Sequence, residues 1–244
     1  MTNRMLAIIQ LMIAISIWSL LSGCESILKP KHGVFIPDAN LRRCLIGQHP
    51  KLMARNYLDT SIAATELVDL LDLSGQQIKS LEGVQYLKRL KALILNNNPK
   101  IRIGQLPDSL TTLYLNDCGL EALPNPLPPR LTRLYCDNNH LRQIPALPIT
   151  LVTLLVGNNE LKDLPALPNQ LEDLSCYFNQ IEKLPTLPTT LLKLHCNFNQ
   201  IGSVPTLPNY LVHLYWANNP AECLSNLPDS IKYYDKLPIV CPMK

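Results

Sequence analysis

The 244-residue sequence has few aromatic residues, few glycines and no cluster of basic residues. Aromatic residues make up 6% of the chain and hydrophobic residues 47%, so a buried core would be largely aliphatic. The chain has 22 lysine and arginine residues against 19 aspartate and glutamate residues, and this near-neutral charge argues against a nucleic-acid partner. Proline is abundant instead, with 21 residues against 9 glycines, and this argues against long helices.

The first 23 residues have the layout of an export signal. A short basic start over residues 1–4 precedes an almost wholly apolar run over 5–21. The run ends in Leu-Ser-Gly-Cys at 21–24, which resembles the bacterial lipobox. That resemblance implies cleavage before Cys24 and lipid chains on its thiol and amine. The alternative is an uncleaved signal anchor, because the run is nearly long enough to span a bilayer.

The expected location follows from this anchor. Each buried CH₂ group contributes about 0.8 kcal/mol, so two or more acyl chains such as palmitate hold a protein stably on a membrane. Residues 24–33 would form a short tether. Glu25 argues weakly against retention at the inner membrane, so we expect an exported protein at the outer membrane or cell surface.

From Val68 onward the sequence repeats itself. Residues 131–141 (LTRLYCDNNHL) fit the leucine-rich-repeat template L-x-x-L-x-L-x-x-N-x-L. Successive frames begin 22, 20, 21 and then four times 20 residues apart, and a partial frame begins at Ile231. The eight full frames start at Val68, Leu90, Leu110, Leu131, Leu151, Leu171, Leu191 and Leu211. This pattern predicts a leucine-rich-repeat solenoid over 68–230.

Each frame alternates inward and outward residues with a period of two, which is typical of a short strand. Stacked frames would form a curved parallel β-sheet on the concave face, with strands about 4.8 Å apart. The ninth position is expected to carry asparagine because an amide both donates to and accepts from the backbone where each strand ends. The residues at this position are Asn98, Asn139, Asn159, Asn179, Asn199 and Asn219, with Cys118 in the third frame.

The segments that return from strand to strand read Leu-Pro-x-Leu-Pro, as at 164–168 (LPALP). Two prolines three residues apart exclude a helix interior and favour extended, polyproline-like backbone, with Leu164 and Leu167 pointing inward. Over about 106–230 the pattern resembles the short class of repeats in secreted effectors of enteric pathogens and in bacterial ubiquitin ligases. The first frame, with 81–87 (LEGVQYL), resembles the 22-residue internalin type.

Both ends of the array are expected to carry caps, because an uncapped end exposes core. Residues 34–67 would form a small helical N-terminal cap, since 36–46 (IPDANLRRCLI) are similar to the helical cap before many such arrays. Residues 231–244 would form the C-terminal cap. Cys223 and Cys241 flank it, and in an exported protein a disulfide between them would pin it; two free thiols are the alternative.

The remaining cysteines are interpreted as core residues. Cys136, Cys176 and Cys196 occupy the inward sixth position, where other frames carry leucine or valine, so we expect small buried hydrophobic groups and no metal. Trp216 fills the same position in the last full frame and would plug the end of the core. No cofactor is expected.

The third, fifth and seventh positions face the concave side, and nothing in the fold requires tyrosine or histidine there. Aromatic residues with arginine on a rigid sheet are typical of binding hot spots, although tyrosine also suits strands by propensity. Phe178 and Phe198 are expected to pack together and are not counted as a site. The predicted partner-binding residues form a first patch (Tyr114, Arg133, Tyr135) and a second (Tyr177, His195, His213, Tyr215), with Asp173 and Lys193.

Catalysis is not expected. Ser175, His195 and Asp173 lie close together, but a triad needs an acid on the far ring nitrogen and an oxyanion hole. The resembling ubiquitin ligases carry a large catalytic domain after their repeats, and this sequence ends soon after its last frame. The sequence favours a lipid-anchored envelope protein that binds a protein, with host-directed binding as a subset. The alternative is a structural envelope protein whose repeats space or pack against neighbours.

Overall fold

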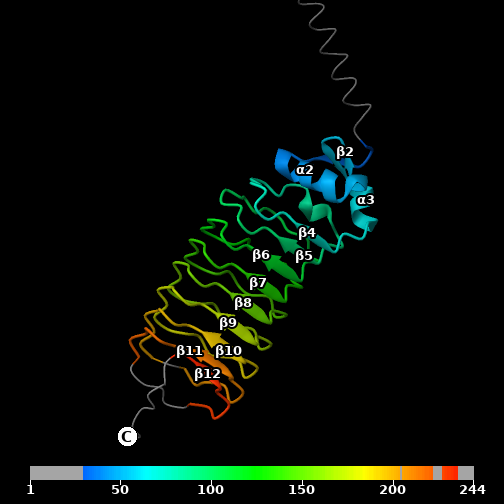
Figure 1. The fold of residues 1–244 in the computed structure, drawn as a ribbon. Helices are drawn as coiled ribbons and strands as arrows, with labels where there is room; N and C mark the ends of the chain where they lie inside the picture. Colours follow the sequence, from blue (N-terminus) through cyan, green and yellow to red (C-terminus); the bar gives the residue numbers. More distant parts are fainter. Residues whose placement is uncertain (1–29, 204, 222–226, 236–244) are drawn as a thin grey trace, which may run out of the picture.

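A computed structural model describes residues 30–203, 205–221 and 227–235. The chain forms a leucine-rich-repeat solenoid in which nine parallel strands stack turn on turn from the N-terminal cap to the other end (Figure 1). The strands, in both chain and spatial order, are β4 (Leu70–Asp72), β5 (Ala92–Ile94), β6 (Thr112–Tyr114), β7 (Arg133–Tyr135), β8 (Thr153–Leu155), β9 (Asp173–Ser175), β10 (Lys193–His195), β11 (His213–Tyr215) and β12 (Tyr233–Tyr234).

Neighbouring strands pair without any slip in register. Leu134 of β7 lies opposite Leu113 of β6 and Leu154 of β8, and this correspondence holds along the whole sheet. Each position of the repeat therefore forms a straight column across the sheet, and the properties of a column can be compared turn by turn.

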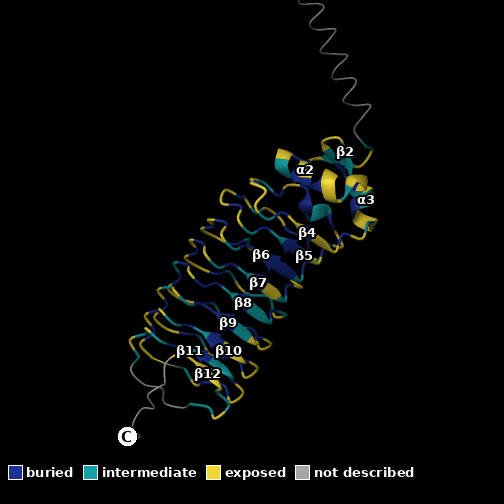
Figure 2. Ribbon diagram, viewed as in Figure 1, coloured by how far each residue is buried: buried dark blue, intermediate teal, exposed yellow. Residues whose placement is uncertain are grey.

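The core lies between the sheet and the return segments, and buried residues recur from turn to turn along the solenoid (Figure 2). Cys136, Cys176 and Cys196 are fully buried in it, as predicted. Burial raises the pKa of the Cys176 thiol to about 12, so this sulfur remains a protonated, hydrophobic group. Trp216 is also buried at the C-terminal end of the core.

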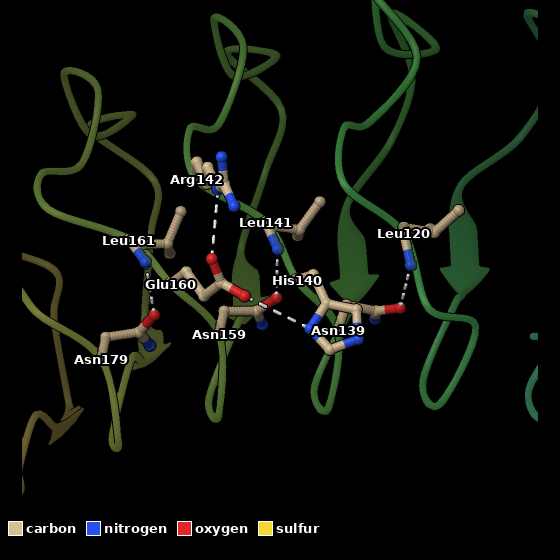
Figure 3. Close-up of polar contacts among 9 residues, drawn as sticks. All are labelled: Leu120, Asn139, His140, Leu141, Arg142, Asn159, Glu160, Leu161 and Asn179. Atoms are coloured by element: carbon tan, nitrogen blue, oxygen red, sulfur yellow. Dashed lines mark hydrogen bonds and ion pairs between the residues drawn. The ribbon is translucent and has the colours of Figure 1, made fainter.

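The predicted asparagine ladder is present at the ends of the strands (Figure 3). The side-chain amide of Asn159 donates to the carbonyl groups of Cys136, Val156 and Gly157 at 3.0–3.1 Å, and its oxygen accepts from the N–H of Leu141 at 3.0 Å. One side chain thus satisfies four backbone groups in two adjacent turns, which buried backbone requires.

Cys118 fills this position differently. Its Sγ lies 3.2 Å from the carbonyl oxygen of Leu95 and 3.4 Å from that of Asn116, so a thiol replaces the amide as donor. A thiol is a weak donor and offers no amide oxygen. The missing acceptor leaves this turn with fewer bonds to the turn before it.

The convex side over the proline-rich frames contains no helix among the described residues, in agreement with the polyproline-like prediction. Leu164 is buried and Leu167 packs against the core. The first repeat differs, because Val84–Tyr86 form a short 3-10 helix after Gly83, whose φ of 105° is a left-handed conformation that favours glycine.

The N-terminal cap contains two helices, α2 (Ala39–Gln48) and α3 (Thr60–Thr65), and a 3-10 turn at Pro50–Leu52. It also contains an antiparallel sheet that the sequence did not predict, in the order β1 (Gly33–Phe35), β3 (Tyr57–Asp59), β2 (Met53–Ala54). Asp38 joins the cap to the first repeat. Its Oδ1 accepts from the first turn of α2, and its Oδ2 accepts from the N–H groups of Lys79 and Ser80.

Several predictions fall on residues outside the described ones, namely the signal over 1–23, the lipidated Cys24, and the Cys223–Cys241 pair. They stay predictions. Within the part of the chain that is described, no helix is long and apolar enough to cross a membrane.

Candidate protein-binding face

Tyr114 and Tyr135 of the first predicted patch lie against each other on the concave face. They occupy the same column on β6 and β7, and their rings stack with centroids 4.3 Å apart and planes within 3° of parallel. The stack covers one face of each ring, and the Tyr135 hydroxyl donates to the Tyr114 oxygen, so the ring edges and the Tyr114 O–H are left to meet a partner. Burial, and then the neighbouring Tyr114, raise the pKa of Tyr135, which keeps this hydroxyl protonated as a donor.

Arg133 lies beside this stack and is exposed. Its Nε donates to Oγ1 of the buried Thr112 on the neighbouring strand at 3.3 Å. No ion pair joins Arg133 to a carboxylate of the described residues. The first patch therefore combines a positioned but unpaired cation with two stacked tyrosines.

The second patch is already paired internally. Lys193 and Asp173, neighbours across β10 and β9, form an ion pair with the nitrogen 3.6 Å from the carboxylate oxygen. His195 lies edge-on to the ring of Tyr215 at 4.4 Å. The Nε2 atom of His195 is buried and has no hydrogen-bond partner among the described residues. Burial lowers the pKa of His195, and the charge of Asp173 opposes this shift.

His213 stacks on Tyr233 of β12, with centroids 4.5 Å apart and planes 11° from parallel. Tyr233 was not among the predicted residues. The partial frame at Ile231 was the signal for it, because counting two residues onward places Tyr233 in the third position, in the column of His213.

Tyr177 does not join the histidines of the second patch by any ring contact. Its ring occupies the space over Gly157 of the preceding turn, where an added Cβ would come within 2.2 Å of it. Its aromatic neighbour is Phe178, edge-on at 5.9 Å. Tyr177 therefore lies between the two patches and leans toward the first.

A second ladder runs along the seventh position and was missed by the sequence reasoning. The side-chain oxygens of Asn96, Asn116 and Asp137 each accept the backbone N–H of the next turn, at 2.9, 2.9 and 2.6 Å. The ladder stops at Gly157, which has no side chain. Burial raises the pKa of Asp137, and its bond from Gly157 opposes the shift. Three consecutive polar residues at this position were its only sequence signal.

Phe178 and Phe198 pack together as expected, with centroids 4.1 Å apart and planes 8° from parallel. Both have left-handed backbone, with φ of 49° and 56°, and both are exposed. Bulky residues rarely adopt this conformation, and the same column elsewhere carries asparagine, aspartate or glycine, which are better suited to it. The stacked pair lies at the rim of the concave face beside Tyr177.

Ser175 and His195 are lateral neighbours, as their registers required. Asp173, the third residue considered for a triad, is bound to Lys193. Over residues 30–203, 205–221 and 227–235 no three histidine, cysteine, aspartate or glutamate side chains gather as a metal site.

At the outer edge of the turns, Glu160 binds Arg142 at 3.1 Å and His140 at 3.3 Å (Figure 3). All three side chains extend from the segment that follows the asparagine ladder, away from the two patches. The Arg142–Glu160 ion pair and the His140 contact thus join neighbouring turns in addition to the backbone bonds and the asparagine ladder.

The registered repeats and the parallel sheet define a leucine-rich-repeat protein. No protein-family model matches the chain, and no curated protein matches it. Its structural neighbours are bacterial leucine-rich-repeat proteins. It is 30% identical to YopM from Yersinia enterocolitica WA-314, with a TM-score of 0.56 over 67% of this chain and 39% of that one.

It is also 30% identical to YopM from Yersinia pestis, described as a leucine-rich effector protein, with a TM-score of 0.60 over 68% of this chain and 48% of that one. The functional domain of InlJ from Listeria monocytogenes, described as including a cysteine ladder, is 22% identical, with a TM-score of 0.62 over 85% of this chain and 52% of that one. The chain thus spans about half or less of the length of these structures. The likeness supports the leucine-rich-repeat fold, which is typical of protein-binding scaffolds.

Proposed function

We propose that this chain is an exported, lipid-anchored envelope protein that binds a protein partner through the concave face of its solenoid and catalyses no reaction. The observation that carries the proposal is the gathering of tyrosine, histidine, arginine and lysine in registered columns of the concave sheet, where the fold needs none of them. Solenoids of this class offer extended concave surfaces for binding.

The test is site-specific photocrosslinking from the full chain in the bacterium that makes it. A photoreactive phenylalanine analogue replaces Thr153, which lies on β8 between the two patches, or the exposed Ala166 on the convex side as the matched control. The expected result is a discrete protein adduct from position 153 and none from position 166. Adducts from position 166 alone would favour the structural alternative, in which the repeats pack against neighbours, and would refute the concave site.

The lipid anchor is supported by the apolar run and by the Leu-Ser-Gly-Cys box at 21–24. Cells that express the chain are labelled with a palmitate analogue, and Cys24→Ser is compared with the conservative Ser22→Ala. Labelling should be lost only in Cys24→Ser. Labelling that survives Cys24→Ser would refute the anchor and leave the binding proposal intact.

Placement at the outer membrane or cell surface is supported by Glu25 after the lipidated cysteine. One of the YopM structures is described as an effector, which makes a host protein one class of partner to consider. Protease added to intact cells should remove the repeats if they face outward. Full protection from the protease would place them on an inner face.

A further inference from the structure

We propose that the first patch receives a carboxylate of the protein partner, so that the partner docks an acidic side chain between the Arg133 guanidinium and the hydroxyl group of Tyr114, at the edge of the stacked Tyr114 and Tyr135 rings. This inference rests on the proposed function, because it assigns a chemistry to the partner at the same face. It predicts which kind of partner residue is needed there.

Arg133 carries a charge that no carboxylate of the described residues balances by an ion pair. The other lysine or arginine in its column, Lys193, is paired with Asp173. Arg133 lies on the concave sheet, has no such pair among the described residues, and is bordered in its column by Thr112 and Thr153. Both of these neighbours are uncharged, so the guanidinium is available to an incoming anion.

The guanidinium of Arg133 is also held in position on the sheet by Thr112. An arginine side chain has five N–H donors, and the bond from Nε to the buried Thr112 uses one of them. The four remaining donors belong to the two terminal nitrogens, whose fork matches a carboxylate in a two-pronged pair. A side chain that is already held on a strand loses less conformational entropy on binding than a free surface arginine.

The stacked tyrosines complete the site. Their parallel arrangement leaves ring edges, which carry partial positive charge, beside Arg133. The Tyr135 hydroxyl donates to Tyr114, which leaves the Tyr114 O–H as the donor for an incoming group. Both features favour an anion over a cation.

The surrounding charges favour a single carboxylate over a polyanion. Asp137 follows the end of β7 by two residues, and the negative charge of Asp173 raises the pKa of Tyr135. These acids would repel the neighbouring charges of a nucleic acid or a phosphorylated glycolipid. One carboxylate on a protein surface meets the cation without bringing further negative charge close to them.

The experiment uses a library of random twelve-residue peptides displayed on phage and selected on the immobilised full chain. Three proteins are compared: the unmodified chain, Arg133→Gln, and Arg142→Gln as the matched control, because Arg142 is an exposed arginine that lies away from both patches and is paired with Glu160. Peptides selected by the unmodified chain and by Arg142→Gln should be enriched in aspartate or glutamate at one position. Arg133→Gln should select peptides without this enrichment.

The affinity of one selected peptide is then measured by fluorescence polarisation. Loss of a hydrogen bond to a charged group costs about 1.5–3 kcal/mol, so Arg133→Gln should weaken binding roughly tenfold or more. Arg133→Lys, which keeps the charge and loses the fork, should give an intermediate loss. Replacing the acidic residue of the peptide by its amide should reproduce the Arg133→Gln loss on the unmodified chain.

Acidic enrichment that persists in Arg133→Gln would overturn the inference, as would selection that returns no acidic preference. Stronger displacement of the peptide by inorganic phosphate than by acetate at equal ionic strength would reassign the site to phosphoryl groups and also overturn it. In each of these cases an adduct from position 153 would still support the proposed function. Failure of the carboxylate inference can therefore be told apart from failure of the proposed function.

Discussion

The two patches of the concave face are built from similar residues and differ in how those residues are paired. In the first patch, Arg133 has threonines on both neighbouring strands and keeps its charge free. In the second, Lys193 has Asp173 beside it and forms an ion pair. The repeat frame is the same in both places. The chemistry of a concave position is therefore decided by the residue one strand away, which is 20 or 21 residues away in sequence.

The largest expected effect concerns Asn159, which lies between the two patches and helps to hold them on one rigid body. Asn159→Ala removes four side-chain hydrogen bonds between the patches and should lower the free energy of unfolding by about 3 kcal/mol. Denaturation is followed by Trp216 fluorescence, which reports the second half of the array, and by circular dichroism. The two transitions should coincide in the unmodified chain and separate in the variant.

Gln180→Ala is the control for this prediction. Gln180 is exposed, and its substitution should change the unfolding free energy by about 0.5 kcal/mol or less. An equal loss of unfolding free energy in both variants would show that the side-chain bonds of Asn159 do not stabilise the fold.

The stacked tyrosines of the first patch should be energetically coupled. A double-mutant cycle with Tyr114→Leu and Tyr135→Leu should give a coupling energy of about 0.5–1.5 kcal/mol in urea denaturation, because stacked aromatic pairs contribute this much beyond their buried area. The pair Tyr135 and Tyr215, which lies in the same column on β7 and β11, should show coupling near zero. Equal coupling in both cycles would remove the basis for treating the patches separately.

The ion pair of the second patch should contribute little to folding. Asp173→Ala is expected to lower the unfolding free energy by about 0.2–1 kcal/mol, since exposed ion pairs rarely contribute more. The same variant frees Lys193 and so makes the second patch resemble the first. Peptides with an acidic residue should then gain a second, weaker binding site on the full chain. A stoichiometry that stays unchanged would show that a free cation alone does not make such a site.

The smallest effect is expected from pH. The groups around His195 are Asp173, Lys193, His213, Asp235 and Tyr215, and burial lowers its pKa below the ordinary value of about 6.5. The unfolded chain therefore takes up this proton at a higher pH than the folded chain does. Stability should fall as the pH is lowered through about 6.5 toward the depressed value of the folded state.

The measurement for this prediction is the difference in unfolding free energy between pH 7.5 and pH 5.5. His195→Phe keeps a ring against Tyr215 and removes the titrating group. The variant should show a smaller difference than the unmodified chain. If His195→Phe leaves the difference in unfolding free energy between the two pH values unchanged, other titrating groups cause the pH dependence.

Much of the fold could be predicted because the repeat fixes it. A frame that recurs every 20 residues determines which side chains point inward, so the buried Cys136 and the bonds of Asn159 followed directly from position. The antiparallel sheet of the cap was missed, because strands of two or three residues leave no periodic signal.

The candidate site could be predicted only in part. Its columns followed from the frame, but the direction in which a side chain leans depends on the space beside it. Tyr177 leans over Gly157 because only glycine leaves room there. The pairing of Lys193 and the freedom of Arg133 depend on side-chain conformations that a linear pattern does not contain.

The unbroken register has a consequence for how such a surface can change. Because the turns repeat with one spacing, the interval between the two patches takes only whole multiples of about 4.8 Å. Duplicating the frame at 151–170, which carries neither patch, would move them apart by one such step, and it would keep a threonine beside Arg133 and a glycine before Tyr177. Gain of a single turn is thus a route by which a relative of this chain would fit a longer partner.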